Sequence, residues 1–134
     1  MISRYSREEM RAVWSEERKL QIWLEIEVLA CEAMAELGQI PREDAEVIRR
    51  KAAFDADRVR EIERRTNHDV IAFLEDVATH VGPEARWIHQ GLTSSDLLDT
   101  TLAVQMVESL DLLEKDLLAL RDKVAARALE HKFT

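Results

Sequence analysis

The stretch His89-Gln90-Gly91-Leu92-Thr93-Ser94-Ser95-Asp96 lies directly before the longest unbroken helical pattern in this chain of 134 residues. Thr93 and Asp96 have the spacing of a capping box, in which a hydroxyl at the N-cap and an acid three residues later satisfy the free N–H groups of a first helical turn. We therefore expect a helix to begin here. The same free N–H groups and the positive end of the helix dipole bind anions, so the cap is also a candidate ligand site.

The region after this stretch is expected to be one long helix. No Gly or Pro interrupts residues 94–131, which predicts a rod roughly 57 Å long, more than the diameter expected of a globule of this size. Apolar residues recur along it in steps of three and four, as in a helical bundle: Ala103, Met106, Leu110, Leu113, Leu117, Leu120 and Val124. One helix cannot cover these side chains. We therefore expect a multi-helix bundle completed by other chains or by further sequence, and a chain that is truncated after Thr134.

The residues before the stretch predict only helices, because Gly and Pro are scarce and no run alternates as a strand does. We expect an all-α fold with a small N-terminal helical domain over residues 1–92, followed by the start of a truncated central bundle domain over residues 93–134. The expected elements are an extended arm over residues 1–5, a helix opened by a Ser6–Glu9 capping box, a helix from Ser15 to Gly38, helices from Pro41 and from Asp55, a helix after the polar break Thr66-Asn67-His68-Asp69, and a turn after Gly82-Pro83.

Composition excludes several classes of protein. The formal net charge of −8 argues against nucleic acid as a partner, since phosphate binding needs a basic face. No apolar run approaches the roughly 20 residues of a membrane span, and no signal peptide opens the chain, so we expect a cytoplasmic protein with no membrane partner. Cys31 is the single cysteine, which predicts a buried, reduced thiol.

Three polar clusters lie at helix entries or in the arm before one: Arg4-Tyr5, Asn67-His68-Asp69, and the stretch from His89 to Asp96. Each has a plain structural interpretation. Asn67 and Thr93 would be caps, and Arg4 an ordinary surface arginine. On local pattern alone, the interpretation stops at an all-α bundle with candidate anion sites.

The chemistry of the same side chains permits a second interpretation. An arginine forms a forked, charge-assisted contact with phosphate, and Tyr5 adds a donor beside Arg4. His68 next to Asp69 has the means to donate a proton or to orient another group. Thr93 and Ser94 bring hydroxyl donors to a helix N-terminus.

These clusters, in this order and spacing, resemble the N-terminal region of the adenylosuccinate lyase family, within the fumarase/aspartase superfamily. The matching strings are Arg4-Tyr5, Arg65-Thr66-Asn67-His68-Asp69-Val70-Ile71-Ala72, and the stretch from His89 through Thr100. The last string is the most specific, because related lyases carry different residues at this helix entry. The resemblance covers the whole chain but only about a third of the family's length.

The resemblance implies a lyase that eliminates fumarate from adenylosuccinate, giving AMP, and from the succinylated imidazole carboxamide ribotide of purine biosynthesis. It implies no cofactor and no metal. By position, Arg4 and Tyr5 would hold the nucleotide phosphate, and Thr93 and Ser94 a succinyl carboxylate. Asn67, His68 and Asp69 would line the substrate site, with His68 in a supporting catalytic role, and His89 is a weaker candidate.

The resemblance also implies that the proton chemistry lies elsewhere. In the family, the general acid is a histidine in a Thr-His-Gly-type motif and the general base a serine on a Gly-rich loop, and neither motif occurs in these 134 residues. We therefore expect the segment alone to be inactive and the working enzyme to be a homotetramer joined through the long helix. The alternatives are another lyase or a cycloisomerase of the superfamily, or a non-catalytic helical oligomerisation module.

Overall fold

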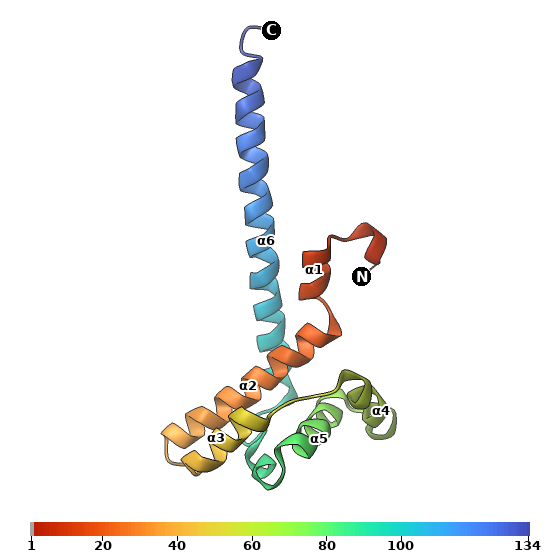
Figure 1. The fold of residues 1–134 in the computed structure, drawn as a ribbon, viewed down its shortest axis with the longest axis vertical. Coiled ribbons are helices and arrows are strands. Elements are labelled where there is room, and N and C mark those ends of the chain that lie inside the picture. Colours follow the sequence, from red (N-terminus) through yellow and green to blue (C-terminus); the bar gives the residue numbers. More distant parts are fainter. Residues whose placement is uncertain (1) are drawn as a thin grey trace.

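A computed structural model describes residues 2–134, and residue 1 lies outside the described part. The described residues form helices and no strand, which confirms the all-α prediction. Figure 1 shows one long helix rising from a base of crossing helices, with the N-terminal segment beside its middle. The elements in chain order are η1 (Ser3–Tyr5), α1 (Glu8–Val13), α2 (Glu16–Glu36), α3 (Arg42–Lys51), α4 (Ala56–Thr66), α5 (Asp69–Val81), η2 (Pro83–Trp87) and α6 (Ser94–Glu130), where η denotes a 3-10 helix.

Helix α2 is bounded by the signals that the sequence contains. The Ser15 hydroxyl oxygen accepts a hydrogen bond from the backbone N–H of Arg18 at 3.1 Å, as an N-cap does. At the other end, Gly38 has φ of +72°, and the N–H of Gln39 donates to the carbonyl oxygen of Met34 at 2.9 Å. This is the Schellman arrangement that a left-handed glycine permits. Both predicted ends of the helix are confirmed.

The extended arm predicted for residues 1–5 is wrong where the structure describes it. Residues 3–5 form a 3-10 turn, in which the N–H of Tyr5 donates to the carbonyl oxygen of Ile2 at 3.0 Å. The backbone therefore forms a hydrogen-bonded 3-10 turn here and is not extended.

The capping box predicted for Ser6 and Glu9 is also wrong. The hydroxyl of Ser6 donates back into the preceding turn, to the carbonyl oxygen of Ile2 at 3.2 Å. Helix α1 therefore begins later, at Glu8, after the N-cap residue Arg7, whose side chain makes no capping hydrogen bond.

The core lies in the base, between α2, α3, α4 and α5. Its centre is an edge-to-face pair of rings, Trp23 and Phe73, whose centroids are 5.5 Å apart. The Cys31 thiol is fully buried in the same core, as predicted, and burial raises its pKa from 9.0 to about 11. The other buried apolar side chains of this cluster are Leu20, Val28, Ala35, Ile40, Ala45, Ile48, Val59, Val70, Ala72, Val77, Val81 and Leu97.

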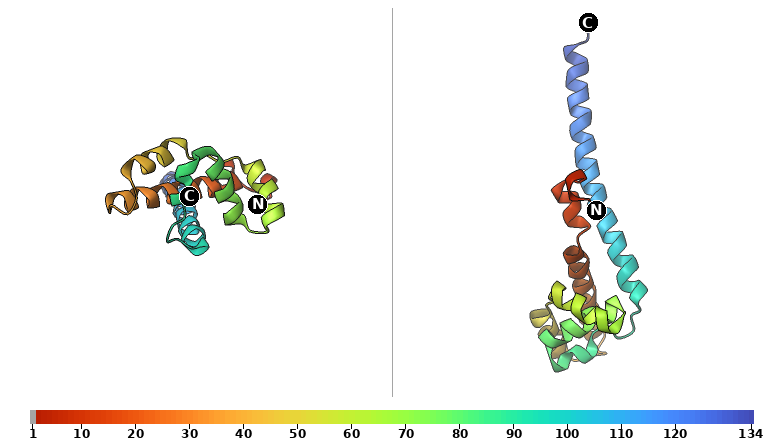
Figure 2. Two further views of the ribbon diagram at one scale, coloured as in Figure 1. Left: turned by 90° about the horizontal axis from the view of Figure 1, so that it is seen from below. Right: turned by 90° about the vertical axis from the view of Figure 1, so that its right-hand side faces the viewer.

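Helix α6 touches the base only with its first turns and then rises past α1, as the right-hand view of Figure 2 shows. Its buried residues are Leu97, Thr101 and Gln105, which are spaced four apart and lie on one face. The helix ends at Glu130, one residue before the predicted end. The division of the chain at residues 92 and 93 stays a prediction.

The apolar seam of α6 lies in solvent in the isolated chain. Leu110, Leu113, Leu117 and Val124 are each about half exposed or more, and Leu117 is 65% exposed. The chain therefore leaves this seam uncovered. This agrees with the expectation that a single helix cannot cover its own apolar side chains. The partner that covers it stays a prediction.

Within residues 2–134, no helix is long and apolar enough to cross a membrane.

Candidate functional site

The connection from η2 to α6 is held in an unusual backbone conformation. His89 has φ of +65° and Gly91 φ of +75°, both in the left-handed region. Glycine enters this region without strain, whereas histidine does so only when its surroundings hold it there. The strained residue of this connection is therefore His89.

Thr93 is the N-cap residue of α6, as predicted. Its backbone N–H donates to Oδ2 of Asp96 at 2.7 Å, and its hydroxyl donates to the same oxygen at 3.2 Å. The proton of the Thr93 hydroxyl is thus already used within the cap. Ser94, the first residue of the helix, is half-buried beside the N–H groups of the first turn, and Ser95 is exposed. As donors for an anion, the Ser94 hydroxyl and the first-turn N–H groups are better placed than Thr93.

His89 is anchored by a buried carboxylate from α2. The backbone N–H of His89 donates to Oε2 of Glu27 at 2.8 Å, and the ring Nδ1 lies 2.6 Å from Oε1. The side chain of Glu27 is 1% exposed and that of His89 is 21% exposed. Burial raises the pKa of Glu27, and the contact with His89 opposes that rise.

The cluster at residues 67–69 joins α4 to α5. Asn67 closes α4 with φ of 50°, and His68 is the N-cap residue of α5. The cap expected at Asn67 is therefore made by its neighbour: Nδ1 of His68 accepts the N–H of Ile71 at 3.3 Å. Asparagine enters the left-handed conformation at little cost and ends the preceding helix instead.

The cap fixes how His68 presents its ring. Because Nδ1 accepts a hydrogen bond, the neutral imidazole carries its proton on Nε2, which becomes a donor. The side chain of His68 is half exposed, and Asp69 Oδ1 lies 3.7 Å from Nδ1. His68 and Asp69 therefore form one polar surface beside the start of α5.

Arg4 and Tyr5 belong to η1, at the start of the N-terminal segment. The guanidinium of Arg4 stacks 4.7 Å from the centre of the Tyr5 ring, and Tyr5 is 73% exposed. Tyr5 lines a surface hollow with Leu112, Leu113 and other residues of α1 and α6. Both side chains are exposed and therefore accessible to a ligand.

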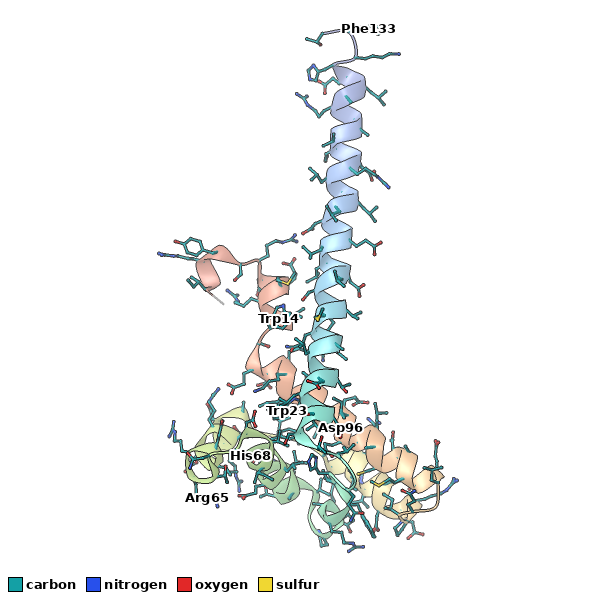
Figure 3. The ribbon with its side chains drawn as sticks, turned by 180° about the vertical axis from the view of Figure 1, so that it is seen from behind. Trp14, Trp23, Arg65, His68, Asp96 and Phe133 are labelled. Atoms are coloured by element: carbon teal, nitrogen blue, oxygen red, sulfur yellow. The ribbon has the colours of Figure 1, made fainter. Side chains whose placement is uncertain are left out.

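The structure brings two of the three clusters to the same end of the molecule and leaves the third apart. Figure 3 shows His68 and Asp96 both in the base, where α6 begins. Tyr5 instead lies beside Leu113, about twenty residues further along α6 than Thr93, or about 30 Å along the helix axis. A ligand at Thr93 cannot also touch Tyr5 of the same chain.

Glu27 is the residue of this region that sequence analysis did not single out. A signal was present, because an acid stands among the apolar residues Trp23, Leu24, Val28 and Cys31 on the buried side of α2. Its partner His89 is 62 residues away, so the pattern did not identify the pair. Within residues 2–134, no group of three or more His, Cys, Asp or Glu side chains is placed to hold a metal ion.

Comparison with known proteins gives a family match and close relatives. Residues 3–134 match the family described as Lyase. The chain is 51% identical over all 134 residues to the adenylosuccinate lyase of Bacillus subtilis (strain 168), and 51% identical to that of Streptococcus mutans serotype c (strain ATCC 700610 / UA159). It spans 31% of the length of each of these relatives.

Solved structures of other lyases and of cycloisomerases share the fold. A fumarate lyase from Mesorhizobium sp. BNC1 superposes with a TM-score of 0.85 at 27% identity, over 94% of this chain and 31% of its own. A β-carboxy-cis,cis-muconate cycloisomerase from Acinetobacter calcoaceticus sp. ADP1 superposes with a TM-score of 0.85 at 25% identity, over 96% of this chain and 32% of its own.

Proposed function

Because the chain belongs to the lyase family, whose match covers residues 3–134, we propose that the natural protein is an adenylosuccinate lyase. The observation that carries the proposal is the 51% identity to two adenylosuccinate lyases over every residue of the chain. The fumarate lyase and the cycloisomerase of the same fold are only 27% and 25% identical. The substrates are adenylosuccinate and the succinylated imidazole carboxamide ribotide, and the location is the cytoplasm, where purine nucleotides are made.

The reaction is a β-elimination. A base removes a proton from the succinyl carbon next to the C–N bond, that bond breaks, and an acid protonates the departing nitrogen, so fumarate and AMP leave. We assign the acid and the base to residues beyond this segment. The task of this segment is to bind and orient the substrate, which lowers the entropy cost of bringing it to those groups.

We assign a succinyl carboxylate to the N-terminus of α6. The first-turn N–H groups and the half-buried Ser94 hydroxyl supply donors, and the helix dipole favours a negative group there. Asp96 is negative, but its Oδ2 already accepts two hydrogen bonds from Thr93, which reduces its repulsion of an anion. His68 presents Nε2–H from the start of α5. There it assists the general acid or contacts the substrate phosphate.

We assign the nucleotide phosphate to Arg4 and Tyr5, in a site completed by another copy of the chain. The separation of about 30 Å between Tyr5 and Thr93 within one chain supports this division, since both would otherwise have to reach one substrate. The exposed seam of α6 supports a homotetramer built around a helical bundle. In such an assembly, each site takes one cluster from one chain and another cluster from its neighbour.

The test is fumarate release by the natural full-length protein. Adenylosuccinate and the succinylated ribotide should each be cleaved, with fumarate and the nucleotide product formed in equal amounts. Carboxymuconate, argininosuccinate and aspartate serve as comparison substrates. Turnover of one of these without turnover of adenylosuccinate would replace the proposal by another reaction of the superfamily, and turnover of none would favour an oligomerisation module.

A further inference from the structure

The carboxylate of Glu27 is enclosed inside the base, yet both of its oxygens are used by one residue of the connection before α6. Oε2 accepts the backbone N–H of His89 at 2.8 Å, and Oε1 lies 2.6 Å from the ring Nδ1. A buried carboxylate is costly to desolvate, and it is retained only where it is fully hydrogen-bonded. The pair therefore fixes both the backbone and the ring of His89.

The two contacts leave one ring atom available. The Nδ1 edge of His89 faces the buried carboxylate, Nε2 lies on the other side of the ring, and 21% of the side chain is exposed. The first contact also holds His89 at φ of +65°, a conformation that a non-glycine residue adopts only under constraint. Three residues lie between His89 and Thr93, which places their Cα atoms within about 14 Å of each other.

We propose that Glu27 is a positioning residue, which accepts Nδ1–H of a protonated His89 ring and so holds the ring with Nε2–H donating to an oxygen of the nucleotide substrate bound beside the N-terminus of α6. The inference rests on the proposed adenylosuccinate lyase function for its ligand. Its structural basis, a carboxylate that orients an imidazole through Nδ1, is a common way to fix which ring nitrogen meets a ligand. Because the contacted oxygen takes no part in bond breaking, the interaction strengthens substrate binding rather than the chemical step.

The test compares two substitutions of Glu27 in the full-length protein. Glu27→Met removes both acceptors but fills the same space with an apolar chain, which a core tolerates in place of a buried ion. It should raise KM for adenylosuccinate about 10- to 100-fold, the effect of losing one well-oriented hydrogen bond to a charged group, with kcat little changed. Glu27→Gln should recover most of this loss, because its amide oxygen accepts the backbone N–H of His89 and its amide N–H donates to Nδ1, which leaves the ring proton on Nε2. Glu36→Met, at an exposed position of α2, is the matched control and should behave as wild type.

A double-mutant cycle separates positioning from a general structural role. In a His89→Ala background, Glu27→Met should cause no further loss, since Glu27 acts through that ring. Losses that multiply in the double variant, or wild-type KM in folded Glu27→Met, would overturn the proposal.

Crystal structures of wild type and of Glu27→Met test whether Glu27 positions His89 without any measurement of enzyme activity. The ring or backbone of His89 should move in the variant, and an unmoved ring would refute positioning while leaving the proposed function standing. A wild-type enzyme that does not cleave adenylosuccinate would refute the proposed function, whether or not the ring moves.

Discussion

The side-chain amide of Gln105 donates to the backbone carbonyl oxygen of Val13 across 2.7 Å, which joins α6 to the end of α1. Neighbouring contacts are of the same kind. The indole N–H of Trp14 donates to the Ser109 hydroxyl at 2.9 Å, and Arg18 and Arg7 pair with Glu108 and Asp116. The long helix is thus attached to the N-terminal segment and to the start of α2 through polar groups, while its apolar seam stays free for another partner.

Replacing Gln105 should loosen this attachment. Gln105 is 7% exposed, so Gln105→Leu leaves the Val13 carbonyl oxygen without its donor in a half-buried place. We expect a loss of about 1–3 kcal/mol in the free energy of unfolding, measured with urea. Gln39→Leu, at an exposed position, is the control and should change it by less than about 0.5 kcal/mol. Equal effects of the two substitutions would mean that the hydrogen bond between Gln105 and Val13 does not contribute to the free energy of unfolding.

Charges placed on the free seam of α6 should break the proposed assembly. Leu113 and Leu117 are 49% and 65% exposed in the single chain, so replacing both by Glu costs the monomer little. In a bundle the same side chains would be buried, and two unpaired carboxylates there would be strongly unfavourable. The particle mass, measured by light scattering after size exclusion, should fall. Lys115→Gln with Lys123→Gln changes the charge equally and should leave the mass unchanged.

The helices were largely predictable from sequence, but the packing of α6 was not. Caps, Gly38 and the Gly82-Pro83 stop are local signals, and local signals identified the ends of α2 and α5. The apolar seam indicated which face of α6 needs a partner. It did not indicate that the face packed inside this chain carries Thr101 and Gln105, because polar contacts between helices leave no periodic apolar signature.

The candidate site was predictable to the same extent. Thr93 was recognised as a cap because its partner Asp96 is three residues away. Glu27 and His89 are 62 residues apart, and only the fold shows that they meet. The separation of Tyr5 from Thr93 likewise depends on where η1 lies along α6, which no local pattern encodes.

Ser94 and its neighbour Ser95 offer a matched pair for testing the carboxylate site. Ser94 is half-buried at the first position of α6, and Ser95 is exposed at the next. If the Ser94 hydroxyl donates to a substrate carboxylate, Ser94→Ala should lower kcat/KM for adenylosuccinate about 10- to 100-fold. The free energy of unfolding should change by less than about 0.5 kcal/mol, since the cap is made by Thr93. Ser95→Ala should retain wild-type kinetics, and comparable losses in both variants would remove Ser94 from the site.

His68 combines a structural role with the proposed catalytic one, and two substitutions separate them. His68→Ala removes the acceptor for the Ile71 N–H and should destabilise the protein by about 0.5–2 kcal/mol. His68→Asn supplies a good N-cap in its place and should restore the free energy of unfolding. Neither variant has an imidazole, so fumarate release should fall about 100-fold or more in both. A stable His68→Asn enzyme with wild-type turnover would reduce His68 to a cap.

Cys31 gives the protein a pH dependence that can be worked out in sign. Burial, reinforced by the charges of Glu27 and Glu32, raises the pKa of the thiol from 9.0 to about 11 in the folded protein. Below pH 9 the thiol is protonated in both states and contributes no slope. Between pH 9 and 11 the unfolded chain loses its thiol proton first, so ionisation favours unfolding and the free energy of unfolding falls as pH rises. By pH 10.5 the wild type should have lost about 2 kcal/mol more, relative to pH 8, than Cys31→Ala measured by urea unfolding. The packing lost in Cys31→Ala lowers the free energy of unfolding equally at every pH and does not change its dependence on pH. Lysine and tyrosine side chains titrate in both proteins, so their effects cancel in the comparison. Parallel curves would therefore show that the thiol ionises as easily in the folded core as in water.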